Sequence, residues 1–210
     1  MINVVVCDDH AIVRKGLVQI LSESGDIKVT AEAANFGELR QRLKTAQCNV
    51  LVIDIEMPGK NGIEAIGLLK KEMPRLPAIV LSLYPEDQYA VRALRAGAAG
   101  YINKASAPEK LVEAVRQVAA GRKFISPEVS EALASLVSGE SVDAPHQELS
   151  DREFQVLKLI ASGRKLSEIA AELALSPKTV SVYRARILEK LRLANNVEIA
   201  HYASKNGLVD

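Results

Sequence analysis

Short runs of β-branched residues alternate with amphipathic segments along the first 120 residues, and this alternation constrains the fold more than any other feature of the sequence. Between and after the runs, apolar residues recur with helical spacing. Five strands that alternate with five helices predict a parallel sheet covered on both faces, and nearly continuous apolar strands are expected in such a sheet. The predicted strands are Ile2–Cys7, Ile27–Ala31, Val50–Ile53, Ala78–Ser82 and Gly100–Ile102.

Residues 1–120 are therefore expected to form an α/β domain of the flavodoxin-like kind, with a five-stranded parallel sheet in the order 2-1-3-4-5. Residues 121–147 break the pattern. Within them, Glu128–Val137 could form a short helix that begins at Pro127, whereas Ser138–Gln147 is typical of a linker. Residues 148–210 contain only segments with helical spacing, so they predict a second, all-α domain of four helices.

Composition narrows the class of protein. The 27 Lys and Arg residues balance 26 Asp and Glu residues, and a net charge of +1 argues against wholesale coating of polyanions. No apolar run approaches the ~18 residues of a membrane span, and the start MINVVVCDDH lacks the basic region of a signal peptide. Cys7 and Cys48 lie in or beside apolar runs, which predicts buried thiols in a reducing compartment. We therefore expect a cytoplasmic protein with no membrane partner.

Polar residues stand where the predicted strands end. Asp8 and Asp9 follow the first strand, and Asp54 ends the third. In an open α/β sheet, ligands bind beyond the carboxyl ends of the strands, where the strand order reverses, here between strands one and three. All three aspartates are therefore expected at one rim of the sheet. The fourth and fifth strands should bring Ser82 and Lys104 beside them.

Three carboxylates at close range repel one another unless a cation joins them. Mg²⁺ suits such a site because it takes hard oxygen ligands, keeps several waters and accepts a substrate phosphate. An aspartate can also attack phosphorus and form an acyl phosphate. Asp54 is the better nucleophile since it stands alone on the central strand, whereas the adjacent Asp8 and Asp9 suit metal binding. Each residue taken singly would more simply be a helix cap or a solvated loop residue, but the joint arrangement favours a pocket.

Residues 1–120 resemble the receiver domain of two-component response regulators in the segments VVVCDDH, LVIDIEMPGKNGIEAI, AIVLS and GAAGYINKASAPEKL. The resemblance implies that a sensor histidine kinase, or a phosphotransfer protein, phosphorylates Asp54. It also implies the ligands of the Mg²⁺ ion. These are Asp8, Asp9, Asp54 and the backbone carbonyl of Glu56.

The same resemblance assigns switch residues around the pocket. The Ser82 hydroxyl and the Lys104 ammonium would engage the phosphoryl oxygens, and the Tyr101 ring would turn inward on activation. Two neighbours keep two interpretations each. Tyr84 could gate the pocket or be a half-exposed loop aromatic, and His10 could be a metal or phosphorelay histidine, although a surface residue at the start of a helix is the simpler reading.

The C-terminal segment carries the capping signals of successive helices. Ser150 with Glu153 three residues later is the pattern of a capping box. A second helix is expected over Lys165–Leu173, and Ser176 followed by Pro177 begins a third. Two helices joined by so short a turn predict a helix-turn-helix, whose second helix enters the major groove of DNA.

Helical spacing divides that third helix into a buried face and an exposed face. Val180, Ile187 and Leu191 share one stripe, which must be buried. Residues 176–192 carry five basic side chains against one acidic one, so the flanks of the exposed face suit phosphates and its centre suits base edges. A solvated face in a small bundle is the alternative. The predicted DNA contacts are Lys178, Thr179, Ser181, Val182, Ala185, Arg186 and Lys190.

This segment is similar to the LuxR-type DNA-binding domain in the stretches LSDREFQVLKLIASG, EIAAELALSPKTV and ILEKL. Together with the receiver resemblance, it identifies the chain as a member of the NarL/FixJ family of response regulators. Ser181 and Tyr183 stand where that family often has lysine and histidine, so the DNA sequence that relatives prefer does not transfer. A fourth helix over Asn195–Lys205 would, as in the family, contribute to pairing of DNA-binding domains.

The resulting expectation is a transcription regulator rather than an enzyme with its own substrate. Phosphorylation of Asp54 would promote homodimer formation and binding to a double-stranded DNA operator, and RNA polymerase is a further candidate partner. The alternative is an Mg²⁺-dependent phosphatase with an aspartyl nucleophile. It is disfavoured because that class needs a second aspartate two residues after the nucleophile, where this chain has Glu56. A nucleotide-binding module is disfavoured because no glycine-rich loop follows the first strand.

Overall fold

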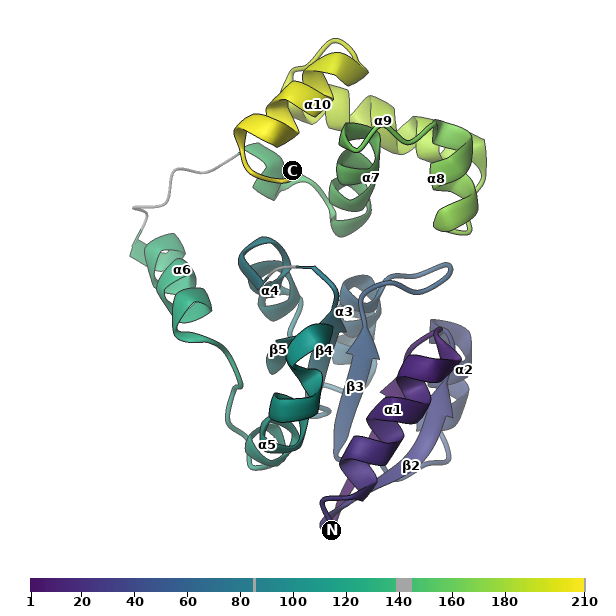
Figure 1. Ribbon diagram of the computed structural model, residues 1–210, viewed down its shortest axis with the longest axis vertical. Coiled ribbons are helices and arrows are strands. Elements are labelled where there is room, and N and C mark those ends of the chain that lie inside the picture. Colours follow the sequence, from purple (N-terminus) through teal and green to yellow (C-terminus); the bar gives the residue numbers. More distant parts are fainter. Residues whose placement is uncertain (85, 139–144, 210) are drawn as a thin grey trace. The chain divides into compact units, whose positions relative to one another are not determined.

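The chain folds as two units, Met1–Glu140 and Ser141–Asp210, in the computed structural model. The structure describes residues 1–84, 86–138 and 145–209, and each unit is described by itself (Figure 1). Within these residues, no helix combines the length and the apolar character that crossing a membrane requires.

A five-stranded parallel sheet in the order β2-β1-β3-β4-β5 forms the centre of the first unit, as the alternating pattern predicts (Figure 1). The strands β2, β3 and β5 run slightly further than their apolar runs, so Asp54 is itself the last residue of β3. The strand bounds are β1 Ile2–Cys7, β2 Ile27–Ala33, β3 Val50–Asp54, β4 Ala78–Ser82 and β5 Gly100–Asn103.

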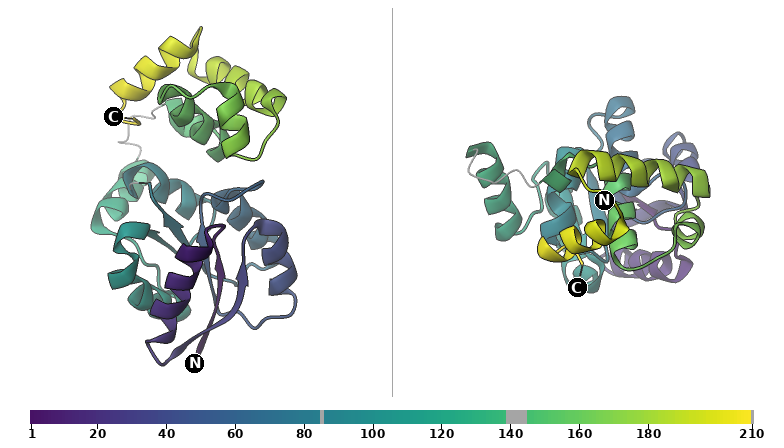
Figure 2. Two further views of the ribbon diagram at one scale, coloured as in Figure 1. Left: turned by 45° about the vertical axis from the view of Figure 1, so that its right-hand side comes forward. Right: turned by 90° about the horizontal axis from the view of Figure 1, so that it is seen from above.

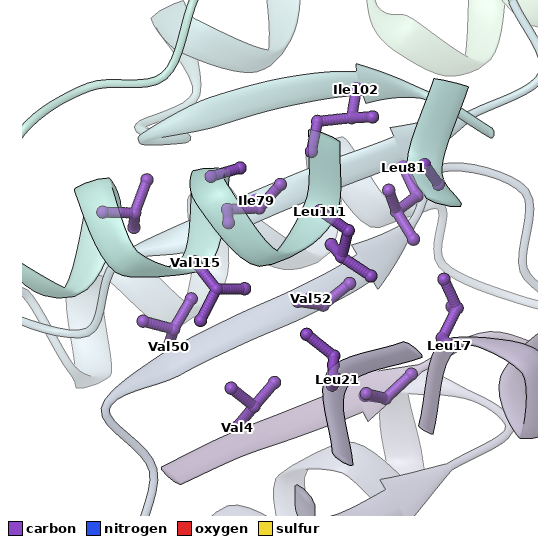
Figure 3. Packing of buried hydrophobic residues seen from close by; sticks show 14 of the residues in the cluster. Val4, Leu17, Leu21, Val50, Val52, Ile79, Leu81, Ile102, Leu111 and Val115 are labelled. Atoms are coloured by element: carbon purple, nitrogen blue, oxygen red, sulfur yellow. The ribbon is translucent and has the colours of Figure 1, made fainter. Parts of the chain in front are cut away.

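Helices cover both faces of this sheet. Figures 1 and 2 show α1 (Ala11–Ser22) and α5 (Ala107–Ala119) on the same face. The opposite face carries α2 (Phe36–Leu43), α3 (Gly62–Glu72) and α4 (Glu86–Arg95). Figure 3 shows how leucines and valines of α1 and α5 pack on the strands and form the core of the first face. The labelled residues are Val4, Leu17, Leu21, Val50, Val52, Ile79, Leu81, Ile102, Leu111 and Val115.

The start of α3 passes unusually close to the end of β3. The Asn61 side chain caps this helix by accepting the backbone N–H of Glu64 at 2.8 Å, and the N–H of Gly62 donates to the carbonyl of Ile55 at 2.9 Å. A Cβ atom on Gly62 would lie 2.0 Å from the backbone oxygen of Asp54. Only glycine fits there, because any side chain would collide with the main chain of β3.

After α5 the chain returns to the edge of the sheet. Phe124 forms an isolated parallel bridge with Gly100, in which its N–H donates to Ala99 at 2.9 Å and its carbonyl accepts the N–H of Tyr101 at 3.3 Å. The short helix predicted after Pro127 is present as α6 (Pro127–Ser138), which contacts α4. Of the segment expected to be a linker, residues 139–144 lie outside the described residues, and Pro145–Glu148 form a short 3-10 helix, η2.

Helices alone make up the described part of the second unit, as predicted. Their bounds are α7 Asp151–Ala161, α8 Leu166–Glu172, α9 Pro177–Leu191 and α10 Asn196–Lys205. Helix α7 contacts each of the other three, so it is the centre of this small core (Figure 1). The predicted capping box is present at its start, where Ser150 and Glu153 exchange hydrogen bonds of 3.3 and 2.8 Å.

The turn between α8 and α9 is short. Ala174 adopts a left-handed backbone conformation with φ of 52°, which reverses the chain directly after α8. Ser176 then caps α9 by accepting the N–H of Thr179 at 3.0 Å, and Pro177 occupies the first turn. The predicted helix-turn-helix is therefore formed by α8 and α9.

Candidate functional site

Strand register places Asp8 beside Asp54. Cys7 at the end of β1 pairs with Ile53 of β3, so the next residue on each strand lies level with the other at the carboxyl edge. Asp8 and Asp54 are both buried, with 0% and 1% of their surface exposed. As predicted, the two carboxylates meet at one rim of the sheet.

Lys104, in the 3-10 turn η1 (Lys104–Ser106) that follows β5, reaches across to both carboxylates. Its Nζ lies 2.8 Å from Oδ2 of Asp8 and 2.8 Å from Oδ2 of Asp54, and only 10% of its side chain is exposed. One ammonium therefore bridges two buried carboxylates. This leaves the cluster with an excess of negative charge.

The protonation of this cluster reflects its burial. Burial raises the pKa of Asp54 to about 7, although the ammonium of Lys104 and the backbone N–H of Glu56 oppose the rise. Burial works against the charge of Lys104, but the Asp54 and Asp8 carboxylates outweigh it and raise the pKa of Lys104. Lys104 is therefore a permanent cation, whereas Asp54 loses its proton near neutral pH in the absence of a metal.

The acidic rim has the donor chemistry of a divalent cation site. Asp8, Asp9, His10 and Asp54 each place one potential ligand atom within 4.8 Å of the others. Three of these groups offer hard carboxylate oxygens, which fit Mg²⁺. His10 stands at the N-cap of α1, with 63% of its side chain exposed and its Nδ1 2.7 Å from Oδ1 of Asp9. This matches the interpretation of His10 as a surface residue, although it lies closer to the cluster than the sequence indicates.

Tyr84 is a half-buried residue near the pocket whose role the sequence leaves open. Its backbone N–H donates to the hydroxyl of Ser82 at 2.9 Å, and its own hydroxyl donates to the carboxylate of Glu56. Its carbonyl accepts hydrogen bonds from the Tyr101 hydroxyl at 2.9 Å and from Asn103 Nδ2 at 3.2 Å. Tyr84 therefore joins the loop after Asp54 to the ends of β4 and β5.

The two predicted switch residues both contact this tyrosine. Ser82 is 1% exposed at the end of β4, and Tyr101 is 3% exposed, so its ring is already buried in this structure. The inward turn of this ring on activation stays a prediction. The only sequence signal for Tyr84 is its position two residues after the strand-terminal serine. A second tyrosine, Tyr89 of α4, stacks on the Tyr84 ring with centroids 4.5 Å apart, so the described part of α4 is connected to the pocket as well.

Helix α9 divides into two faces as the spacing predicts. Val180, Ile187 and Leu191 are buried, whereas most of the predicted DNA contacts are exposed and Thr179 is half-buried. Lys178 and Arg186 form no ion pair within the part of the chain that the structure describes. The exposed face therefore presents cationic groups at its flanks. The exposed members are Lys178, Ser181, Val182, Ala185, Arg186 and Lys190.

Lys190 has a structural partner that the sequence does not reveal. Its Nζ lies 2.6 Å from Oε2 of Glu153 and 3.2 Å from the carbonyl of Glu148. Glu153 is 2% exposed and also accepts the backbone N–H of Ser150. Lys190 thereby links the end of α9 to the start of α7. It therefore has a structural contact within this unit in addition to its predicted contact with DNA.

Comparison with known families assigns a match to each unit. Residues 4–116 match the response regulator receiver domain, and residues 147–203 match the luxR family of bacterial regulatory proteins. The match to the receiver model includes Asp8, Asp9, Asp54, Ser82 and Lys104. The match to the luxR model includes α7, α8 and α9.

Similar proteins cover the whole chain. The response regulator GacA of Pseudomonas aeruginosa is 37% identical over 100% of this chain and 99% of its own length. The response regulator UvrY of Escherichia coli K12 is 36% identical over 99% of this chain and 96% of its own length. Among solved structures, RcsB of Salmonella enterica serovar Typhimurium, bound to promoter rprA in the presence of the phosphomimetic BeF₃⁻, matches with a TM-score of 0.64. It is 28% identical, over 97% of this chain and 99% of that one.

Proposed function

This chain belongs to the NarL/FixJ family of two-component response regulators, DNA-binding proteins that phosphorylation activates, and from that premise we propose that Asp54 receives the phosphoryl group. The observation that carries the proposal is the convergence of Asp8, Asp54 and Lys104 at one buried edge of the sheet. A response regulator is not a catalytic enzyme, and the carboxylate two residues after Asp54, on Glu56, is bound by the Tyr84 hydroxyl.

The phosphoryl donor is a phosphohistidine on a sensor histidine kinase or on a phosphotransfer protein. A carboxylate oxygen of Asp54 attacks the phosphorus, the phosphorus–nitrogen bond breaks, and the imidazole leaves with its electron pair. The attacking carboxylate must be deprotonated, and Lys104 stabilises that form from 2.8 Å away. After transfer, the same ammonium lies where the phosphoryl oxygens gather their charge.

Mg²⁺ is the cation that we assign to the rim. The carboxylates of Asp8, Asp9 and Asp54 and the backbone carbonyl of Glu56 would hold it, because three carboxylate oxygens within reach of one another are hard ligands. When bound, it neutralises charge on the transferring phosphoryl group. Lys104 alone leaves the rim with excess negative charge, which supports a second cation there.

Ser82 is the residue that we propose transmits the phosphorylation of Asp54 to the rest of the domain. Its hydroxyl accepts the backbone N–H of Tyr84 at 2.9 Å, and the same hydroxyl would turn toward Asp54 to donate its proton to a phosphoryl oxygen there. Loss of this hydrogen bond would free the Tyr84 segment, whose carbonyl anchors the hydroxyl of Tyr101. We assign Ser82 and Tyr101 to the switch for this reason, with Tyr84 as the link between them.

The exposed face of α9 is the surface that we assign to double-stranded DNA. The likeness to RcsB, which was solved on a promoter, supports this assignment. Lys178 and Arg186 would contact phosphates. Lys190 already uses two donors on Glu153 and Glu148, so only its third N–H remains for a phosphate. The remaining proposed contacts, between these flanks, are Thr179, Ser181, Val182 and Ala185.

We propose that residues 1–120 receive the signal and that residues 148–210 bind the operator as part of a homodimer. Two copies of α9 on one face of the duplex would read two half-sites one helical turn apart. RNA polymerase is the partner that we propose a promoter-bound dimer contacts. We place these events in the cytoplasm, where the DNA is found and where the free thiols of Cys7 and Cys48 stay reduced.

Acetyl phosphate and Mg²⁺ test the assignment of Asp54. The wild-type protein should gain one phosphoryl group by intact mass, and Asp54→Asn should gain none. Asp26→Asn, at an exposed aspartate that pairs with Arg116, is the matched control and should be labelled like the wild type. Equal labelling of Asp54→Asn and the wild type would overturn the assignment. Labelled wild type should also retard double-stranded DNA at a lower protein concentration than Asp54→Asn.

A further inference from the structure

Arg14 of α1 binds the main chain of the loop that follows β1 and carries Asp8 and Asp9, here called the acidic loop. Its Nη1 donates to the backbone carbonyl of Asp8 at 2.6 Å, and its Nε donates to Oε2 of Glu32 on β2 at 3.1 Å. Only 19% of the Arg14 side chain is exposed. A planar guanidinium fixes both partners in direction as well as in distance, so Arg14 locks the loop after β1 to the neighbouring strand β2.

The carbonyl that Arg14 binds belongs to the peptide that joins Asp8 to Asp9. The other groups of Asp8 are also engaged: its N–H donates to Ala33 at 3.1 Å, its Oδ1 accepts the N–H of His10 at 2.8 Å, and its Oδ2 faces Lys104. The carbonyl is thus the remaining backbone group that could rotate. With Arg14 in place, the peptide plane between the two carboxylates is fixed, and so is the direction in which Asp9 leaves the main chain.

Glu32 has a separate effect on the same arginine. Without a partner, a guanidinium one carbonyl away from the rim could turn onto the Asp8 or Asp9 carboxylate and compete with a divalent cation. The contact of Glu32 with Nε holds one edge of the guanidinium on β2. The fork therefore donates to a carbonyl of the acidic loop, and its charge is balanced by Glu32 rather than by the cation ligands.

We propose that Arg14, oriented by Glu32, is a positioning residue for the divalent cation site. This inference rests on the proposed function, because it assigns the cation to Asp8, Asp9 and Asp54. Groups that orient metal ligands without touching the metal change affinity by about 10–100-fold when they are removed. Arg14→Gln should therefore weaken Mg²⁺ binding by about tenfold or more. The groups that we assign to the attack on phosphorus, Asp54 and Lys104, are unchanged in this variant.

Isothermal titration of the full chain with Mg²⁺ measures this affinity directly. Arg14→Lys keeps the charge but loses the fork, so its dissociation constant should lie between those of the wild type and Arg14→Gln. Glu32→Gln, which frees the guanidinium, should also weaken binding. Arg40→Gln is the matched control, because Arg40 pairs with Glu72 at 2.8 Å elsewhere in the same unit, and its dissociation constant should equal that of the wild type.

The labelling rate with acetyl phosphate separates positioning from damage to the fold. A positioning defect should vanish at saturating Mg²⁺, where Arg14→Gln should label within about twofold of the wild type, whereas a folding defect would persist at every Mg²⁺ concentration. Unchanged Mg²⁺ affinity in Arg14→Gln, or in Arg14→Lys and Glu32→Gln if Arg14→Gln does not fold, would overturn this inference alone. A wild type that neither binds Mg²⁺ nor accepts a phosphoryl group would instead overturn the proposed function.

Discussion

The ammonium of Lys104 lies 2.8 Å from the carboxylate of Asp54, yet burial still raises the pKa of that carboxyl to about 7. The folded state therefore binds the Asp54 proton more tightly than the unfolded chain, whose ordinary value is 3.8. Because the folded state holds more protons between those two values, its free energy of unfolding falls as the pH rises from about 4 to about 7. The pocket thus costs stability at the pH where its nucleophile is charged.

Asp54→Asn should stabilise the metal-free protein at pH 8 by about 1–3 kcal/mol, because the variant no longer buries the Asp54 charge, while the ion pair of Lys104 with Asp8 remains. The gain should shrink as the pH falls toward 4, where the wild-type carboxyl is protonated. Urea unfolding at both pH values measures the two free energies. Asp26→Asn is the control with the opposite sign, since its hydrogen bonds with Arg116 hold the pKa of Asp26 at about 2. An Asp54→Asn variant less stable than the wild type at pH 8 would contradict the argument.

Gly62→Ala should damage the pocket through the backbone. The new Cβ would lie 2.0 Å from the Asp54 carbonyl oxygen, so either α3 or the end of β3 must move. We expect a loss of about 2–4 kcal/mol in unfolding free energy together with slower labelling of Asp54. Gly67→Ala, in the same helix with nothing within 4 Å of its added Cβ, is the matched control and should retain both properties. Equal stability and labelling of the two variants would contradict the close approach.

Lys178→Ala should weaken DNA binding without changing sequence preference. The exposed ammonium of Lys178 is proposed to contact a phosphate, so its loss should lower the slope of log affinity against log salt concentration by about 1. Binding measured at several salt concentrations gives that slope. Lys15→Ala, at an exposed lysine of α1, should leave it unchanged. An equal slope for Lys178→Ala and the wild type would show that Lys178 does not contact a DNA phosphate.

Lys190→Met should lower the free energy of unfolding of the second unit. The loss of a DNA contact alone would leave this free energy unchanged. The substitution leaves the carboxylate of Glu153, which is 2% exposed, with only backbone and capping partners. Because the Lys190 side chain is itself 36% exposed, the expected loss is about 1–3 kcal/mol rather than the full cost of a buried charge. Thermal or urea unfolding of the single variants and of the Lys190→Met, Glu153→Gln double variant measures the coupling.

The double variant should recover part of the loss, since it removes the unpaired charge. The pH dependence supplies a further check. Burial alone would raise the pKa of Glu153, but Lys190 and Ser150 together lower it. The stabilisation by the pair is therefore present at neutral pH and is lost as the pH falls through the folded pKa of Glu153. A coupling that persisted in acid would contradict an ion pair.

The sequence predicted the sheet order and the acidic rim because both follow from local patterns. Each strand is an uninterrupted apolar run, and parallel strands bring their carboxyl ends to one edge, so Asp8, Asp54 and Lys104 could be grouped from position alone. The two faces of α9 were also predictable, since helical spacing fixes which residues share a side.

The side-chain contacts of Tyr84, Arg14 and Lys190 could not be predicted in this way. Their partners are Glu56, Glu32 and Glu153, which lie 28, 18 and 37 positions away in the chain. No periodicity links such pairs, because they depend on how finished elements pack. A helical wheel places Lys190 on an exposed flank but gives no information on the carboxylate that α7 brings beneath it.

The bridge at Phe124 also covers part of β5, an edge strand of the sheet in the first unit. A terminal strand such as β5 offers unpaired backbone groups that can recruit a strand from another molecule, the usual route to edge-to-edge aggregation. Phe124 engages the N–H of Tyr101 and the carbonyl of Ala99 on this strand. Gly100 permits the approach, since a Cβ there would meet the Phe124 oxygen at 3.0 Å. The chain therefore keeps this part of the β5 edge paired with its own backbone.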